Sequence, residues 1–161
     1  MKRKTAFCVI LCVAGVVLLA AVGLWRCLEM KKDKQIISFV KITLDESGMR
    51  FRHEYEIVFS DGQAEVKYYT FSYSDGEEQR IPEKSAECGA DEVLALLNDC
   101  RVFGWDGFVG KHPRGVLDGI MFTFNATVNG GETIYAHGSQ NFPKKYREFR
   151  DGLYEMLNRQ D

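Results

Sequence analysis

Apolar and polar positions divide the chain into one long apolar run and a series of shorter alternating segments. No charged residue occurs from Thr5 to Trp25. A helix rises about 1.5 Å per residue, so a run of this length spans the roughly 30 Å hydrocarbon core of a bilayer. The pattern predicts a transmembrane anchor over residues 5–25, behind a basic tag at residues 1–4.

Strand-like alternation begins after a charged stalk at residues 26–35. Apolar side chains recur at every second position, as in half-buried strands, over residues 36–44, 51–59 and 64–73. Segments rich in Asp and Gly follow these strands and favour tight turns at residues 45–48, 61–62 and 74–76. The pattern predicts an antiparallel meander, followed by a polar, irregular segment over residues 74–89.

The second half of the chain predicts two helices and a hairpin. Apolar residues take helical spacing from Val93 to Cys100 and again from Tyr146 to Leu157. Between them, alternating strands at 120–128 and 133–137 flank an Asn-Gly-Gly turn at 129–131. The order βββαββα predicts a two-layer α+β domain over residues 36–161, in which two helices cover one face of an antiparallel sheet.

The distribution of charged residues limits the kinds of partner that the domain can bind. The chain of 161 residues has a net charge of −2, but residues 1–34 carry 7 Lys and Arg against 2 Asp and Glu, which leaves the domain acidic. An acidic domain argues against nucleic-acid binding, because that binding needs Lys and Arg at the phosphates. No motif in the sequence indicates a cofactor. The predicted partners are the lipid bilayer, through residues 5–25, and an envelope protein.

The apolar run has a second interpretation as a cleaved secretory signal. Lys2-Arg3-Lys4 suits the basic start of such a signal, and Ala21-Val22-Gly23 suits a cleavage site. A signal's apolar core usually has only about 7–15 residues, which favours the uncleaved anchor. Trp25, at the end of the run, suits the membrane interface.

The sequence indicates insertion into the membrane more directly than it indicates which side of the membrane the domain faces. Basic residues lie on both sides of the apolar run, at residues 2–4 and in the stalk. The positive-inside rule, which compares the Lys and Arg content of the two sides, is therefore nearly balanced. The compact tag at the extreme N-terminus favours a single-pass protein of the cell membrane with residues 36–161 outside. Lipidation is not expected, because bulky or charged residues precede the cysteines of the anchor and stalk, Cys8, Cys12 and Cys27.

Catalytic and metal signatures are weak. His137 and Ser139 follow the last predicted strand and Asp118 precedes its partner, so a Ser-His-Asp arrangement is conceivable, although no nucleophile-turn motif accompanies it. His53 and the other histidines lie in separate segments without the close pairing of a zinc site. We therefore expect no metal, and a hydrogen-bonded His53 at the edge of the core.

The cysteines of the domain, Cys88 and Cys100, flank the first predicted helix. An ideal helix of about ten residues places its ends roughly 15 Å apart, beyond the reach of a disulfide. Two free thiols are expected, with Cys100 in the core.

The glycine-rich segment 103–117 combines aromatic and basic residues and is the candidate binding site. It carries Trp105, Phe108, Lys111, His112 and Arg114. Such a loop is often a recognition surface; alternatively its aromatic residues cover the core and its basic residues are solvated. We expect Trp105 to be buried and any recognition to fall to the basic residues.

Several motifs resemble an uncharacterised extracytoplasmic domain of membrane-anchored proteins and lipoproteins in Gram-positive bacteria. These motifs are Trp105-Asp106-Gly107-Phe108, Val116-Leu117-Asp118-Gly119, Phe122-Thr123-Phe124, Gly138-Ser139-Gln140-Asn141-Phe142-Pro143 and Tyr146-Arg147-Glu148-Phe149. The resemblance is densest over residues 103–150. It implies an extracytoplasmic position and no known reaction, and the chain departs from it in lacking a lipidation motif.

The sequence therefore predicts a membrane-anchored binding or interaction module without enzymatic activity. The alternatives are an envelope hydrolase using His137, Ser139 and Asp118, and a regulatory domain that faces the cytoplasm.

Overall fold

The computed structural model describes residues 34–74 and 76–159. A compact domain begins at Gln35. The predicted tag and anchor, and the stalk up to residue 33, lie outside the described residues. Within the described residues, no helix has the length and apolar character that crossing a membrane requires.

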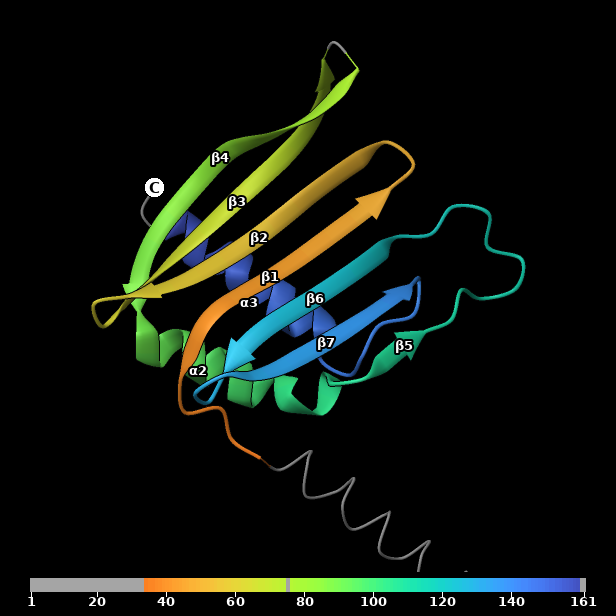
Figure 1. The fold of residues 1–161 in the computed structure, drawn as a ribbon. Helices are drawn as coiled ribbons and strands as arrows, with labels where there is room; N and C mark the ends of the chain where they lie inside the picture. The colour runs from red at the N-terminus through yellow and green to blue at the C-terminus, as the bar shows by residue number, and fades with distance from the viewer. Residues whose placement is uncertain (1–33, 75, 160–161) are drawn as a thin grey trace, which may run out of the picture. The chain divides into compact units, whose positions relative to one another are not determined.

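A seven-stranded sheet forms the framework of the domain (Figure 1). Its strand order is β4-β3-β2-β1-β6-β7-β5. Neighbouring strands are antiparallel, except that β5 runs parallel to β7. The strands are β1 (Phe39–Gly48), β2 (Phe51–Ser60), β3 (Gln63–Ser74), β4 (Glu77–Gly89), β5 (Phe108–Gly110), β6 (Met121–Val128) and β7 (Glu132–Ser139).

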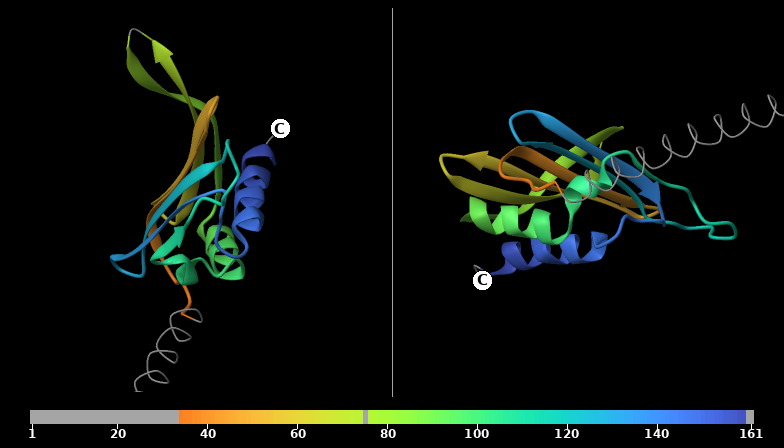
Figure 2. Two further views of the ribbon diagram at one scale, coloured as in Figure 1. Left: turned by 90° about the vertical axis from the view of Figure 1, so that its right-hand side faces the viewer. Right: turned by 90° about the horizontal axis from the view of Figure 1, so that it is seen from below.

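Two helices cover one face of this sheet and leave the other face open (Figure 2). They are α2 (Ala90–Asp99) and α3 (Tyr146–Asn158), and a short 3-10 helix, η1 (Val102–Trp105), follows α2. The burial pattern of β6 reflects this arrangement, because residues buried on one face of the strand alternate with more exposed residues on the other. The buried residues are Phe122, Phe124, Ala126 and Val128. The predicted α+β class is confirmed.

The predicted element order is wrong at residues 74–89. This segment forms strand β4 and pairs with β3 along its length. β4 lies at an edge of the sheet and its side chains are largely exposed, with Ala86 buried. An edge strand with little burial needs no apolar alternation, so the period-2 signal is missing. Pro82, which usually argues against a strand, lies beside a register irregularity in this edge pairing.

Segment 103–117 also contains structure that the pattern did not indicate. Residues 102–105 form η1, and residues 108–110 form β5, which makes the sheet mixed rather than purely antiparallel. A three-residue strand is too short to show periodicity.

The turn predicted at residues 45–48 is wrong, because β1 continues to Gly48 and pairs there with Phe51. Met49 and Arg50 make the turn instead. A Cβ at Gly48 would lie 2.6 Å from the exposed Phe51 ring, so a larger residue there would displace that ring.

The other hairpin turns are confirmed. Asp61 and Gly62, and likewise Asn129 and Gly130, have positive φ angles, as tight hairpin turns between twisted strands require. Asn129 has a second role, since its side chain bonds the backbone of Gln35 and Ile37. Cys88 and Cys100 are free thiols as predicted, and Cys100 is buried.

Candidate functional site

A pocket of about 590 Å³ lies between α3 and the first four strands of the sheet. Each strand from β1 to β4 contributes side chains to its wall, and α3 closes the other side. The lining residues that carry chemistry include Glu46, His53, Tyr55, Tyr68, Glu83, Lys84 and Arg150.

Glu46 is the centre of a buried hydrogen-bond network in this pocket. Its side chain points toward α3 and the residue is 2% exposed. The Tyr146 hydroxyl donates to Glu46 Oε1 over 2.8 Å, and His53 Nε2 lies 2.8 Å from Glu46 Oε2. Arg150 Nη1 is 3.9 Å from Oε1. The network therefore joins β1, β2 and α3 through one carboxylate.

These contacts keep the buried carboxylate ionised. Burial raises the pKa of Glu46, but hydrogen bonds from His53 and Tyr146 and the charge of Arg150 outweigh it, so the pKa lies below the ordinary 4.5. The pKa of the Tyr146 phenol lies far above its ordinary value, because burial and the nearby Glu46 carboxylate both disfavour its ionised form.

Aromatic rings form much of the remaining wall. The rings of Tyr55 and Tyr68 are 5.1 Å apart, and His53 lies within 6 Å of both. Burial, with the charge of Glu46, raises the pKa of Tyr55 to about 12, so the phenol is neutral at physiological pH. The wall thus offers ring faces and neutral hydroxyls beside charged groups.

The sequence pattern did not identify this site. It predicted correctly that His53 is hydrogen-bonded at the core edge, but it placed Glu46 in a turn. Extending the alternation of Ile42 and Leu44 by one step would have put Glu46 on the buried face of β1. A buried acid at such a position is the available signal, because an ionised carboxylate inside a protein requires partners.

Of the predicted binding residues, the aromatic ones belong to the core. Trp105 is 3% exposed, packs against Phe124 and Phe149, and donates its indole N–H to Lys144 O over 3.1 Å. Phe108 is partly buried against the core. The expected burial of Trp105 is confirmed, and neither ring forms an exposed recognition surface.

The basic residues of the segment, Lys111, His112 and Arg114, are exposed. His112 does not act alone: its Nδ1 lies 2.7 Å from Ser139 Oγ and its Nε2 lies 2.7 Å from Val116 O. The structure thus brings His112 to Ser139, a pairing that the sequence did not suggest.

The three residues considered for a hydrolase are placed differently. Ser139 contacts His112, Asp118 is exposed, and His137 Nδ1 is buried without a hydrogen-bond partner in the described structure. Among residues 34–74 and 76–159, no group of three potential ligands (His, Cys, Asp or Glu) is arranged to hold a metal.

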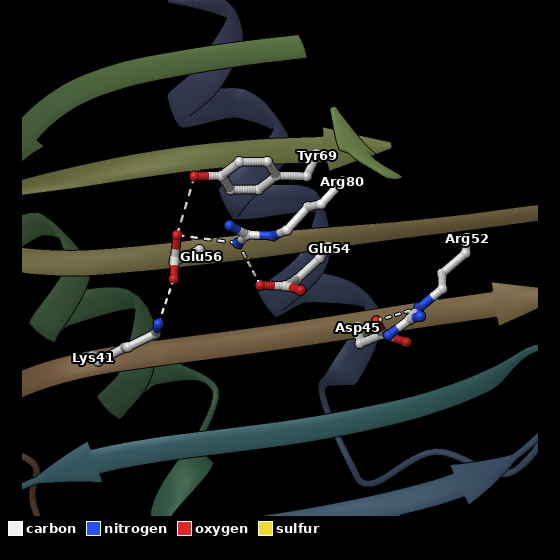
Figure 3. Close-up of polar contacts among 7 residues, drawn as sticks. All are labelled: Lys41, Asp45, Arg52, Glu54, Glu56, Tyr69 and Arg80. Atoms are coloured by element: carbon white, nitrogen blue, oxygen red, sulfur yellow. Dashed lines mark hydrogen bonds and ion pairs between the residues drawn. The ribbon is translucent and has the colours of Figure 1, made fainter. Parts of the chain in front are cut away.

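The open face of the sheet carries a second polar cluster (Figure 3). Glu56 is buried there beneath Lys41 Nζ at 2.5 Å, Arg80 Nη2 at 3.1 Å and the Tyr69 hydroxyl at 3.1 Å. Arg80 also bonds Glu54, and its guanidinium lies 3.3 Å from the centre of the Tyr69 ring. These groups neutralise one another across β1 to β4, so the cluster ties the strands together rather than presenting a free charge.

Comparison of the chain with protein-family models, with curated proteins and with solved structures gives no match.

Proposed function

We propose that residues 36–161 form an extracytoplasmic binding module, tied to the cell membrane by residues 5–25, and that the Glu46 pocket holds its ligand. One observation carries the proposal: an ionised, buried carboxylate with three partners lies in the wall of a pocket of about 590 Å³. Small-molecule sites commonly enclose about 300–1,000 Å³ and combine apolar walls with a few fixed polar groups.

The point at which the chain enters the domain is compatible with such a role. The chain enters beside the β6–β7 turn, where Asn129 bonds Gln35 and Ile37, and where Asn98 bonds both the N–H and the carbonyl of Ile36. Glu46 and His53 lie toward the other end of β1 and β2, near the β1–β2 turn (Figure 1). The point of chain entry and Glu46 therefore lie toward opposite ends of β1.

The lining favours a neutral ligand with hydroxyl groups. The carboxylates of Glu46 and Glu83 balance the cations of Lys84 and Arg150. Tyr68, which is half-buried and packs against the buried Tyr55, adds a ring face on which the apolar face of a sugar ring can pack. The best-supported ligand class is therefore a short neutral oligosaccharide.

Calorimetric titration of the full-length chain in mild detergent tests this proposal. The probes are three neutral trisaccharides: chitotriose, maltotriose and cellotriose. Binding of at least one is expected, with affinity at least tenfold weaker in Tyr68→Ala. Tyr135→Ala, which removes a tyrosine from the open face, is the matched control and should bind as wild type does. Failure of all three sugars to bind, or equal affinity in Tyr68→Ala, would refute the proposal.

A further inference from the structure

We infer that Ser139 is a nucleophile, that His112 is its general base, and that the pair hydrolyses small carboxylic esters with short aliphatic acyl groups. This activity lies outside the Glu46 pocket and does not depend on ligand binding there. It rests on the arrangement of three groups from β7 and the 111–119 loop: the Ser139 hydroxyl, the His112 ring and the Val116 carbonyl.

The hydrogen bonds determine which ring nitrogen carries the proton. Val116 O can only accept a hydrogen bond, so His112 Nε2, 2.7 Å away, carries the hydrogen. In the neutral ring Nδ1 then has a free lone pair, and it lies 2.7 Å from Ser139 Oγ. A nucleophile bonded to a base that is itself oriented by a third group is the arrangement that activates serine.

The loop after Ser139 is held firmly, which fixes the position of the nucleophile. Gln140 has a left-handed backbone, with φ of 51°, and bonds Ile120 twice: its N–H donates to Ile120 O, and its side-chain oxygen accepts from Ile120 N. A Cβ at Gly110 or Gly138 would lie 2.1 or 2.5 Å from Asn141 O. Glycine at both positions lets the loop close onto β5 and β7.

A third glycine positions the base. A Cβ at Gly119 would lie 2.8 Å from His112 Cε1, so a larger residue there would displace the imidazole from its position beside Ser139. Close packing against glycine backbone thus helps to position both Ser139 and His112.

Exposed apolar side chains next to the pair indicate the substrate class. Met121 is directly opposite Ser139 in the β6–β7 register and is 53% exposed. Leu117, which follows the carbonyl that orients His112, is 95% exposed. Apolar surface beside the half-buried Ser139 hydroxyl suits the aliphatic chain of an acyl ester.

The reaction balances without a cofactor. Ser139 Oγ attacks the ester carbonyl carbon while its proton passes to His112 Nδ1. The bond between that carbon and the alcohol oxygen breaks, and His112 returns the proton to the departing alcohol. Water then attacks the acyl-serine, again losing a proton to His112, and the acid leaves as Ser139 regains its hydrogen.

A fluorophosphonate probe tests the nucleophile directly, because Oγ displaces fluoride from phosphorus and stays covalently labelled. The full-length chain in detergent is treated, and the labelled residue is located by peptide mass spectrometry. Labelling at Ser139 is expected, together with hydrolysis of p-nitrophenyl butyrate. His112→Ala should slow both by about 100-fold, the usual contribution of a general base. Ser60→Ala, which removes an exposed hydroxyl at the end of a different strand, should leave both unchanged.

Gly119→Ala is a second variant, which displaces the His112 ring without removing it, and it should slow labelling at least tenfold. Thermal melts of all variants separate this effect from misfolding. Absence of label at Ser139, or full-rate labelling in His112→Ala, would overturn the inference. So would loss of labelling in His137→Ala alone, since the base would then be His137.

Discussion

Replacing Tyr146 with Phe tests whether the Glu46 network stabilises the fold. The substitution removes one oxygen and the hydrogen bond of 2.8 Å that it donates to Glu46 Oε1. It retains the ring, whose centre lies 4.8 Å from that of Phe122 and 4.7 Å from that of Phe142. The change is therefore close to a pure loss of one hydrogen bond to a buried charge.

The expected loss is about 2 kcal/mol in the free energy of unfolding, because a hydrogen bond to a charged group contributes about 1.5–3 kcal/mol. His53 and Arg150 still contact the Glu46 carboxylate in the variant, so its negative charge keeps two of its three partners. Urea unfolding of the full-length chain, followed by near-ultraviolet circular dichroism, measures the difference. Tyr154→Phe is the control, since that side chain lies on the same helix and is exposed.

The pH dependence follows from the direction of the Glu46 shift. The pKa of Glu46 in the folded protein lies below its ordinary value of 4.5. Its stabilising contribution is therefore complete above that pH and is lost as the pH falls below it. Wild type and Tyr146→Phe should differ most at neutral pH and converge in acid. A loss under 0.5 kcal/mol at pH 7, or a difference that grows in acid, would refute this account of the network.

Three other predictions concern the core, the open face and the topology. Trp105→Ala should destabilise the domain by about 3–5 kcal/mol in urea unfolding, as expected for a large aromatic side chain removed from a core; a change below 1 kcal/mol would contradict its structural role. Glu56→Gln should cost about 1 kcal/mol at pH 7 in the same assay. Hydrogen bonds from Lys41 and Arg80 outweigh burial and hold the pKa of Glu56 at about 2, so this difference should close as the pH falls from 4.5 towards 2; a difference independent of pH would exclude the ion pairs as its source. Protease added to intact protoplasts should remove residues 35–161, whereas protection until lysis would place the domain in the cytoplasm.

The local sequence pattern correctly predicted the elements that are encoded by residues close together in the chain. The strands of the meander and the final hairpin alternate because one face of each packs against the helices. The turns at Asp61-Gly62 and Asn129-Gly130 are encoded by residues that tolerate positive φ. The burial of Trp105 was predictable from the flanking glycines, which let the chain turn the indole inward.

Strand β4 was not predictable in this way, because its stability comes from hydrogen bonds to β3 and from side chains on the open face. Arg80 of β4, for example, reaches Glu54 and Glu56 of β2. Such polar contacts leave no periodic apolar signature in the strand itself.

Both candidate sites depend on tertiary structure for the same reason. Tyr146 meets Glu46 across 100 positions of sequence, and His112 meets Ser139 across 27. The sequence supplies each side chain and the face of the element that carries it. Which acid meets which phenol, and which histidine meets the serine, is decided by strand register and by the close backbone contacts that glycine permits.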